Sequence, residues 1–148
     1  MISIKQKLFL YIFSGLLVFS QTSVSAYTVQ EQQYQQAQQQ RAEQERIAQE
    51  VRAIFNNGMS AFQNKDYYAC INYLSRIESF AGNNKNYNIA LGESFRQLKN
   101  YNNAIKYLGK ALQLGAQDFT TLTGLGYSYM DIGNYNGAYK YLSVANGR

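Results

Sequence analysis

The fold is decided by residues 91–112, which read LGESFRQLKNYNNAIKYLGKAL. In the second half of this stretch, Ala104, Leu108 and Ala111 recur three or four positions apart, which is the spacing of one helical face. Lys99-Asn100 precedes them with residues typical of a turn and a helix cap. We therefore expect two helices joined by a short turn, with Gly92 small enough to let the pair approach closely.

This arrangement occurs three times in the chain. Gly58, Gly92 and Gly126 recur at a constant interval, and five further columns keep the same period. A 34-residue period without β-type alternation indicates a helix-turn-helix solenoid. The further columns are Tyr67, Tyr101 and Tyr135; Cys70, Ala104 and Ala138; Tyr73, Tyr107 and Tyr141; Leu74, Leu108 and Leu142; and Ile77, Ala111 and Ala145.

On these residues the chain resembles the tetratricopeptide repeat (TPR) family. The second repeat matches the family pattern best, while the first departs from it at Asn57 and Ala61 and every repeat lacks the terminal Pro. The resemblance implies an all-α fold, a TPR helix-turn-helix solenoid of three 34-residue repeats (about 51–84, 85–118 and 119–148), preceded by a Gln-rich helix. We expect first helices near 51–64, 86–98 and 119–132, and second helices near 68–80, 102–114 and 136–146.

Residues 1–26 have the three parts of a secretory signal peptide. Lys5 and Lys7 give a positive start, residues 8–19 are apolar, and residues 24–26 read Val-Ser-Ala. The apolar run is shorter than the roughly 20 residues that span a membrane, which argues against the alternative of an uncleaved anchor. We expect cleavage after Ala26 and a periplasmic or secreted protein whose formal net charge falls from +5 to +3.

Residues 27–50 form a Gln-rich helical or low-complexity leader, in which ten positions are Gln. Gln, Glu, Arg and Ala favour a helix from about Val29 onward. Tyr34, Arg41, Ala48 and Phe55 recur at every seventh position. This heptad has polar occupants, so both a solvated helix and a weak self-associating coiled coil stay open.

Composition excludes most catalytic and metal chemistry. The chain has no His, Trp or Pro and a single Cys, which removes a His base, a His or Cys-rich metal site and an internal disulfide. Outside the repeat columns no carboxylate pair or nucleophile–base motif occurs, so we expect no enzyme, no catalytic residue, no metal and no cofactor. Lys and Arg are scattered singly, which argues against nucleic-acid binding. We expect Cys70, in the column of Ala104 and Ala138, to be buried.

The resemblance also implies a concave groove lined by the first helix of each repeat. Family members that hold acidic chaperone tails use Lys and Asn where this chain has Phe55 and Met59, so we expect a different partner. The alternative to a partner-binding surface is that Phe55, Met59 and Phe62 pack beneath the leader helix. Glu93 and Arg96 are three positions apart on one expected helix, so an ordinary surface ion pair explains them better than a catalytic role does. The implied groove residues are Phe55, Met59, Phe62, Ile89, Glu93, Arg96, Gln97, Tyr127, Met130 and Asp131.

These features predict an exported protein–protein interaction scaffold that binds a peptide or helix in its groove. An export signal, a Gln-rich helix and C-terminal repeats are similar in layout to a periplasmic cell-division coordinator, which suggests a role in cell-envelope assembly. The alternative is a structural oligomerisation protein whose only partner is itself. Self-association would use the leader or the last helix, where we expect Tyr139, Leu142 and Ala145 to lack cover on one side.

Overall fold

The computed structural model describes the backbone of residues 4–147 and the side chains of residues 27–147. Over this range it forms seven helices and no strand. The chain separates into two compact units, Met1–Ile47 and Ala48–Arg148. The predicted signal peptide, residues 1–26, lies outside the residues whose side chains are described.

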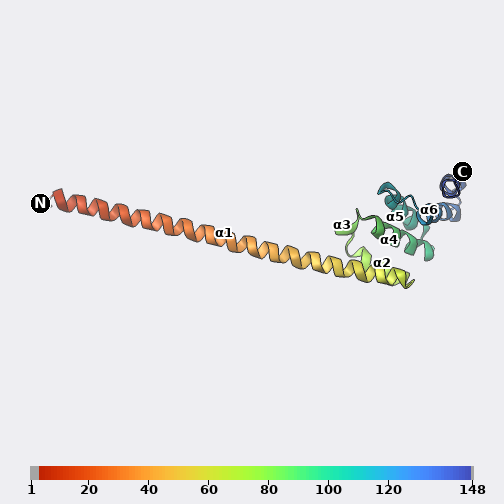
Figure 1. Ribbon diagram of the computed structural model, residues 1–148, viewed down its shortest axis with the longest axis horizontal. Coiled ribbons are helices and arrows are strands. Elements are labelled where there is room, and N and C mark those ends of the chain that lie inside the picture. The colour runs from red at the N-terminus through yellow and green to blue at the C-terminus, as the bar shows by residue number, and fades with distance from the viewer. Residues whose placement is uncertain (1–3, 148) are drawn as a thin grey trace. The chain divides into compact units, whose positions relative to one another are not determined.

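Helix α1 (Ile4–Gln63) contains the Gln-rich leader and the first helix of the first repeat (Figure 1). Side chains 27–46 are exposed on every face of the helix, and Ile47 is the first that is half-buried. A helix without a buried face depends on intrinsic propensity, which the Gln, Glu, Arg and Ala residues supply. In the described part of the chain, no helix is both long and apolar enough to cross a membrane.

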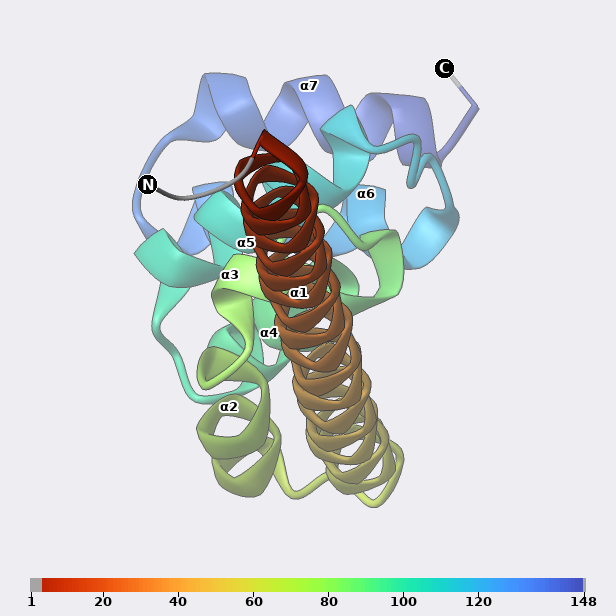
Figure 2. The same ribbon diagram turned by 90° about the vertical axis from the view of Figure 1, so that its left-hand side faces the viewer.

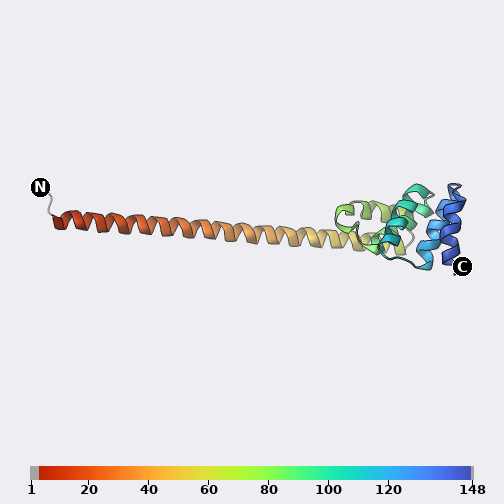
Figure 3. The same ribbon diagram turned by 90° about the horizontal axis from the view of Figure 1, so that it is seen from above.

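The second unit is a TPR-type helical solenoid. After α1 come α2 (Tyr67–Ser75), α3 (Glu78–Ala81), α4 (Lys85–Gln97), α5 (Tyr101–Gln113), α6 (Phe119–Asp131) and α7 (Tyr135–Ala145). Figure 2 shows α2, α4, α5, α6 and α7 layered in chain order, and α6 and α7 lie side by side as the last pair (Figure 3). Helices α4 to α7 lie within one residue of the expected ranges at both ends.

The turn inside each repeat uses one backbone conformation. Lys65, Lys99 and Gly133, which occupy the same position of the three repeats, have φ of 62°, 60° and 78°. In the second repeat the N–H groups of Lys99 and Asn100 donate back to the carbonyls of Arg96 and Phe95, at 2.9 and 2.8 Å. These bonds satisfy the last carbonyls of α4, as in a Schellman motif. The next residue then caps the second helix, because the Asn100 side chain accepts from the N–H of Asn103.

The glycine column brings each helix pair into contact. A Cβ placed on Gly92 would lie 2.6 Å from Leu108 Cγ, and one on Gly58 or Gly126 would lie 2.5 Å from the equivalent leucine, Leu74 or Leu142. Any side chain in this column would therefore push the two helices apart. The expectation that small residues set the closest approach is confirmed.

The second helix of the first repeat is not continuous, which corrects the expected range 68–80. Helix α2 ends at Ser75 and a short α3 follows Ile77, whose φ and ψ are −119° and 20°. Ile77 is 1% exposed and stands in the column that otherwise holds Ala111 and Ala145. The break places this bulkier side chain in the core. The Tyr87 hydroxyl donates to the carbonyl of Leu74 at the same point, at 3.2 Å.

The core of this unit joins the first two repeats. Its buried cluster is Cys70, Leu74, Ile77, Ala81, Tyr87, Ala90, Leu91 and Tyr107. Cys70 is completely buried, with Sγ 3.9 Å from the carbonyl oxygen of Ala90, so the prediction of burial is confirmed. Burial also raises the pKa of the thiol.

Candidate functional site

The implied groove residues lie on the three first helices of the repeats. Tyr127 and Met130 on α6 are 45% and 42% exposed, and Asp131 and Gln97 are also exposed. Ile89, Glu93 and Arg96 on α4 are half-buried. Phe55, Met59 and Phe62 on α1 are half-buried as well, and they pack against the core cluster.

Glu93, Arg96 and Gln97 form a hydrogen-bonded group on α4. Arg96 donates from Nη2 to Glu93 Oε1 at 2.5 Å and from Nε to Oε2 at 2.8 Å, while Gln97 Nε2 donates to Oε1 at 2.8 Å. The side chains of Arg96 and Glu93 are 25% and 13% exposed. A two-bond contact with this degree of burial holds the guanidinium more firmly than an exposed pair does. The surface ion pair considered above is therefore partly buried.

Helix α6 approaches this pair closely because it carries a glycine there. A Cβ on Gly124 would lie 3.4 Å from Glu93 Oε2 and 3.9 Å from Arg96 Cδ. The hydrogen bonds with Glu93 raise the pKa of Arg96, and the charges of Glu93 and Asp131 add to the shift. Two carboxylates therefore face the one guanidinium, and Glu93 already occupies two of its donors.

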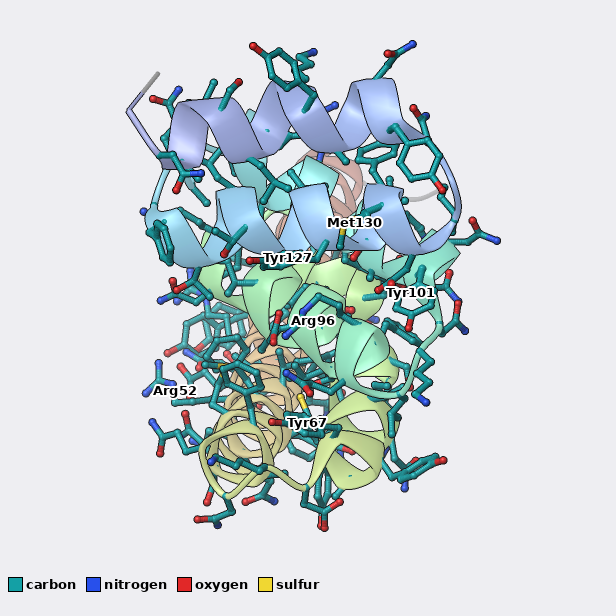
Figure 4. The ribbon with its side chains drawn as sticks, turned by 90° about the vertical axis from the view of Figure 1, so that its right-hand side faces the viewer. Arg52, Tyr67, Arg96, Tyr101, Tyr127 and Met130 are labelled. Carbon is teal, nitrogen blue, oxygen red and sulfur yellow. The ribbon has the colours of Figure 1, made fainter. Side chains whose placement is uncertain are left out.

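Two tyrosines lie at this site although the sequence analysis identified them only as members of a repeat column. Tyr67 begins α2 and lies near Arg96 (Figure 4), and Tyr101 begins α5 beside Asp131. Partial burial and the charge of Asp131 raise the pKa of Tyr101. The signal was present in the sequence, since a side chain on the first helical turn tilts back toward the preceding turn.

Together these residues make a polar centre flanked by exposed apolar side chains. In the view of Figure 4, Arg96 lies between Tyr67 on one side and Tyr127 and Met130 on the other. Tyr101 is nearby, and Arg52 on α1 is farther away. Aromatic, Met and Arg side chains are the types enriched at protein contacts. Among the described residues, no group of acidic or Cys side chains is arranged to hold a metal ion.

Comparison with solved structures finds this fold in MamA. MamA R50E mutant matches with a TM-score of 0.61 and 22% identity, over 66% of this chain and 71% of that one. MamA AMB-1 and MamA MSR-1 match with TM-scores of 0.61 and 0.60, both at 22% identity over 66% of this chain. The chain spans 53% and 56% of the length of these two MamA structures. No family model matches the chain, and no curated protein is similar to it in sequence.

Proposed function

We propose that this protein is an exported scaffold that binds a peptide or a helix of a partner protein in the groove of its repeats. The observation that carries the proposal is the site on α4 and α6, where Tyr127 and Met130 stand exposed beside the half-buried Arg96–Glu93 pair. Apolar side chains provide contact area, while fixed polar groups orient the bound chain.

The chemistry of the site favours an uncharged or weakly charged partner segment. Arg96 already donates twice to Glu93, and Asp131 adds a second negative charge nearby. An acidic tail would meet these two carboxylates, which repel it. A segment with apolar side chains for Tyr127 and Met130 avoids that repulsion and can hydrogen-bond with the exposed Gln97.

Export and a role in the cell envelope are part of the proposal. Export is supported by Lys5 and Lys7, the apolar run and the Val-Ser-Ala sequence that ends at Ala26. The envelope role is supported only by the layout of an export signal, a Gln-rich helix and C-terminal repeats. N-terminal sequencing of the protein from its native cells tests export, and a mature chain that begins at Tyr27 is the expected result. A chain that retains residues 1–26 in the cytoplasm would contradict it.

Groove binding is tested by site-specific photo-crosslinking in the native cells. A photoreactive residue at Tyr127 or Met130 is expected to give an adduct with a discrete protein partner, identified by mass spectrometry. The same residue at Phe80, which is 64% exposed on α3, serves as the control.

The identified partner is then titrated with the purified protein by calorimetry. Tyr127→Ala with Met130→Ala is expected to weaken binding at least about tenfold, the loss typical of central contacts. Tyr68→Ala, at a 76% exposed position on α2, is expected to leave the affinity unchanged. Adducts only with the protein itself, or equal affinities for the two variants, would contradict groove binding.

A further inference from the structure

The exposed large apolar side chains of the second unit gather on the third repeat. Between Phe80 and Phe119 no such side chain is exposed. On α7, by contrast, Tyr135 and Tyr139 are 72% and 76% exposed. Helix α7 is the last layer of the unit, and no helix of the unit covers its outer side (Figures 2 and 4).

The equivalent face of α5, the second helix of the preceding repeat, packs against the first helix of the next repeat, α6. Leu108 is 0% exposed because it packs between two glycines. A Cβ placed on Gly92 would lie 2.6 Å from the Leu108 side chain, and one placed on Gly124 of α6 would lie 2.9 Å from it. Leu142, the equivalent residue of the next repeat, meets Gly126 on one side and stays half-buried. Helix α7 therefore repeats the docking face of α5, and no other helix of the described residues covers that face.

The exposed face of α1, at the opposite end of the solenoid, is not complementary to the exposed face of α7. Helix α4 buries Tyr87, Ala90, Leu91 and Ser94 against the first repeat. The residues one repeat earlier on α1 are all exposed and mostly polar: Ala53, Asn56, Asn57 and Ser60. A second copy stacked head to tail would remove two asparagine side chains from water at positions where α4 has Ala90 and Leu91, and each amide left without a hydrogen-bond partner there costs about 1–3 kcal/mol.

A second α7 is the better match, because the exposed stripe is uncharged. Tyr135, Tyr139, Leu142 and Asn146 follow one another at helical spacing along it. Lys140, the charged residue next to Tyr139, holds its Nζ over the Tyr141 ring at 5.3 Å from the centroid. The stripe itself carries no charged residue, so its self-pairing places no charged side chain of the stripe against another, and it joins tyrosine and leucine side chains that contact each other well.

We propose that two copies of the chain associate through α7, with the helices antiparallel and a two-fold axis passing between Tyr139 and Leu142. In this arrangement Tyr139 of each copy covers Leu142 of the other. A single helix pair buries less surface than the roughly 1,200–2,000 Å² of stable interfaces, so the dimer dissociates on dilution. The inference uses a different face from the groove and does not depend on groove binding.

Sedimentation velocity of the full chain over a range of concentrations tests the proposal. The native protein is expected to shift from monomer to dimer as its concentration rises. Tyr139→Lys is expected to raise the dissociation constant at least about tenfold, since it places two positive charges at the axis. The matched control is Tyr68→Lys, which changes an equally exposed tyrosine on α2 and is expected to leave the dimer intact.

A crosslinking experiment locates the contact even if a lysine variant folds poorly. In a Cys70→Ala background, a single cysteine at position 139 is expected to form a disulfide between copies on mild oxidation, whereas a cysteine at position 68 is not. A native protein that stays monomeric at every concentration would overturn the proposal. Association that survives Tyr139→Lys, or equal crosslinking at the two positions, would overturn it as well.

Discussion

Gly92 and Gly109 show how two glycines of one repeat can have opposite effects on stability. A Cβ on Gly92 would lie 2.6 Å from Leu108 Cγ and 2.8 Å from Leu108 N, whereas one on Gly109 meets nothing within 4 Å. Gly92→Ala is therefore expected to lower the free energy of unfolding by about 1–3 kcal/mol through overpacking. Gly109→Ala, inside α5, is expected to raise it by about 0.5–1 kcal/mol through helix propensity. Urea titrations of both variants measure the difference, and changes of equal sign would contradict the proposed packing.

Cys70 provides a probe of the first repeat. Its thiol is completely buried, and burial raises its pKa, so the reactive thiolate is scarce in the folded state. We expect a thiol reagent to label Cys70 only as fast as the protein unfolds, with the labelled fraction following the helical signal in urea. Cys70→Ala should fold, because Ala104 and Ala138 occupy the same column. Rapid labelling without urea would contradict burial.

Tyr87 predicts a loss of stability in alkali. Its side chain is 0% exposed, and burial raises the pKa of its hydroxyl, with the charge of Glu78 adding to the shift. A raised pKa means that the folded state holds this proton more tightly than the unfolded state does. The stabilisation is therefore complete below the ordinary tyrosine pKa of about 10 and is lost as the pH rises above it.

The variant that isolates this effect is Tyr87→Phe. It removes the hydrogen bond to the Leu74 carbonyl and is expected to cost about 1 kcal/mol at neutral pH. Between neutral and strongly alkaline pH, its unfolding free energy should fall less than that of the native protein. Urea titrations at several pH values measure both curves, and parallel curves would refute the role assigned to the buried hydroxyl.

At the scale of elements, the turns inside the repeats store strain that substitution can relieve. Lys99 has a φ of 60°, a conformation that costs a residue with a Cβ about 1–2 kcal/mol, whereas the third repeat uses Gly133 there. Lys99→Gly is expected to raise the thermal unfolding midpoint, and Gly133→Ala to lower it. Calorimetry of both variants tests the pair. A lower midpoint for Lys99→Gly would show that the lysine contributes more than its strain costs.

The first repeat shows where periodicity stops predicting elements. Repeat columns placed α4 to α7 to within one residue, because each of these helices fills the same positions with residues of similar size. The column that holds Ala111 and Ala145 holds Ile77 in the first repeat, and there the helix breaks into α2 and α3. A 34-residue period records which face a side chain is on, but not whether a larger one fits there without a change in the backbone.

At the scale of the whole molecule, the two units are expected to differ in protection against hydrogen exchange. Side chains 27–46 of α1 are exposed on all faces, so their helix has no tertiary packing to stabilise it. We expect the amides of this stretch to exchange close to the rate of a peptide helix. Those of α4, whose residues Tyr87, Leu91 and Ser94 are buried, should exchange only by global unfolding. Slow exchange throughout 27–46 would instead favour the self-associating coiled coil.

The solenoid could be predicted from the sequence, because its helix pairs bury their apolar faces against one another and therefore carry the same residues at a constant 34-residue interval. It also indicated the small contact column and the burial of Cys70. The side chains that lie near Arg96 and Asp131 were visible only in the folded chain, where Tyr67 and Tyr101 reach them from helices that periodicity treats separately. The structure also showed that Leu142 packs against one glycine, whereas Leu108 packs against a glycine on each side. A repeated pattern shows which side of a helix faces the neighbouring helix, whereas contacts between repeats depend on how closely three helices approach one another.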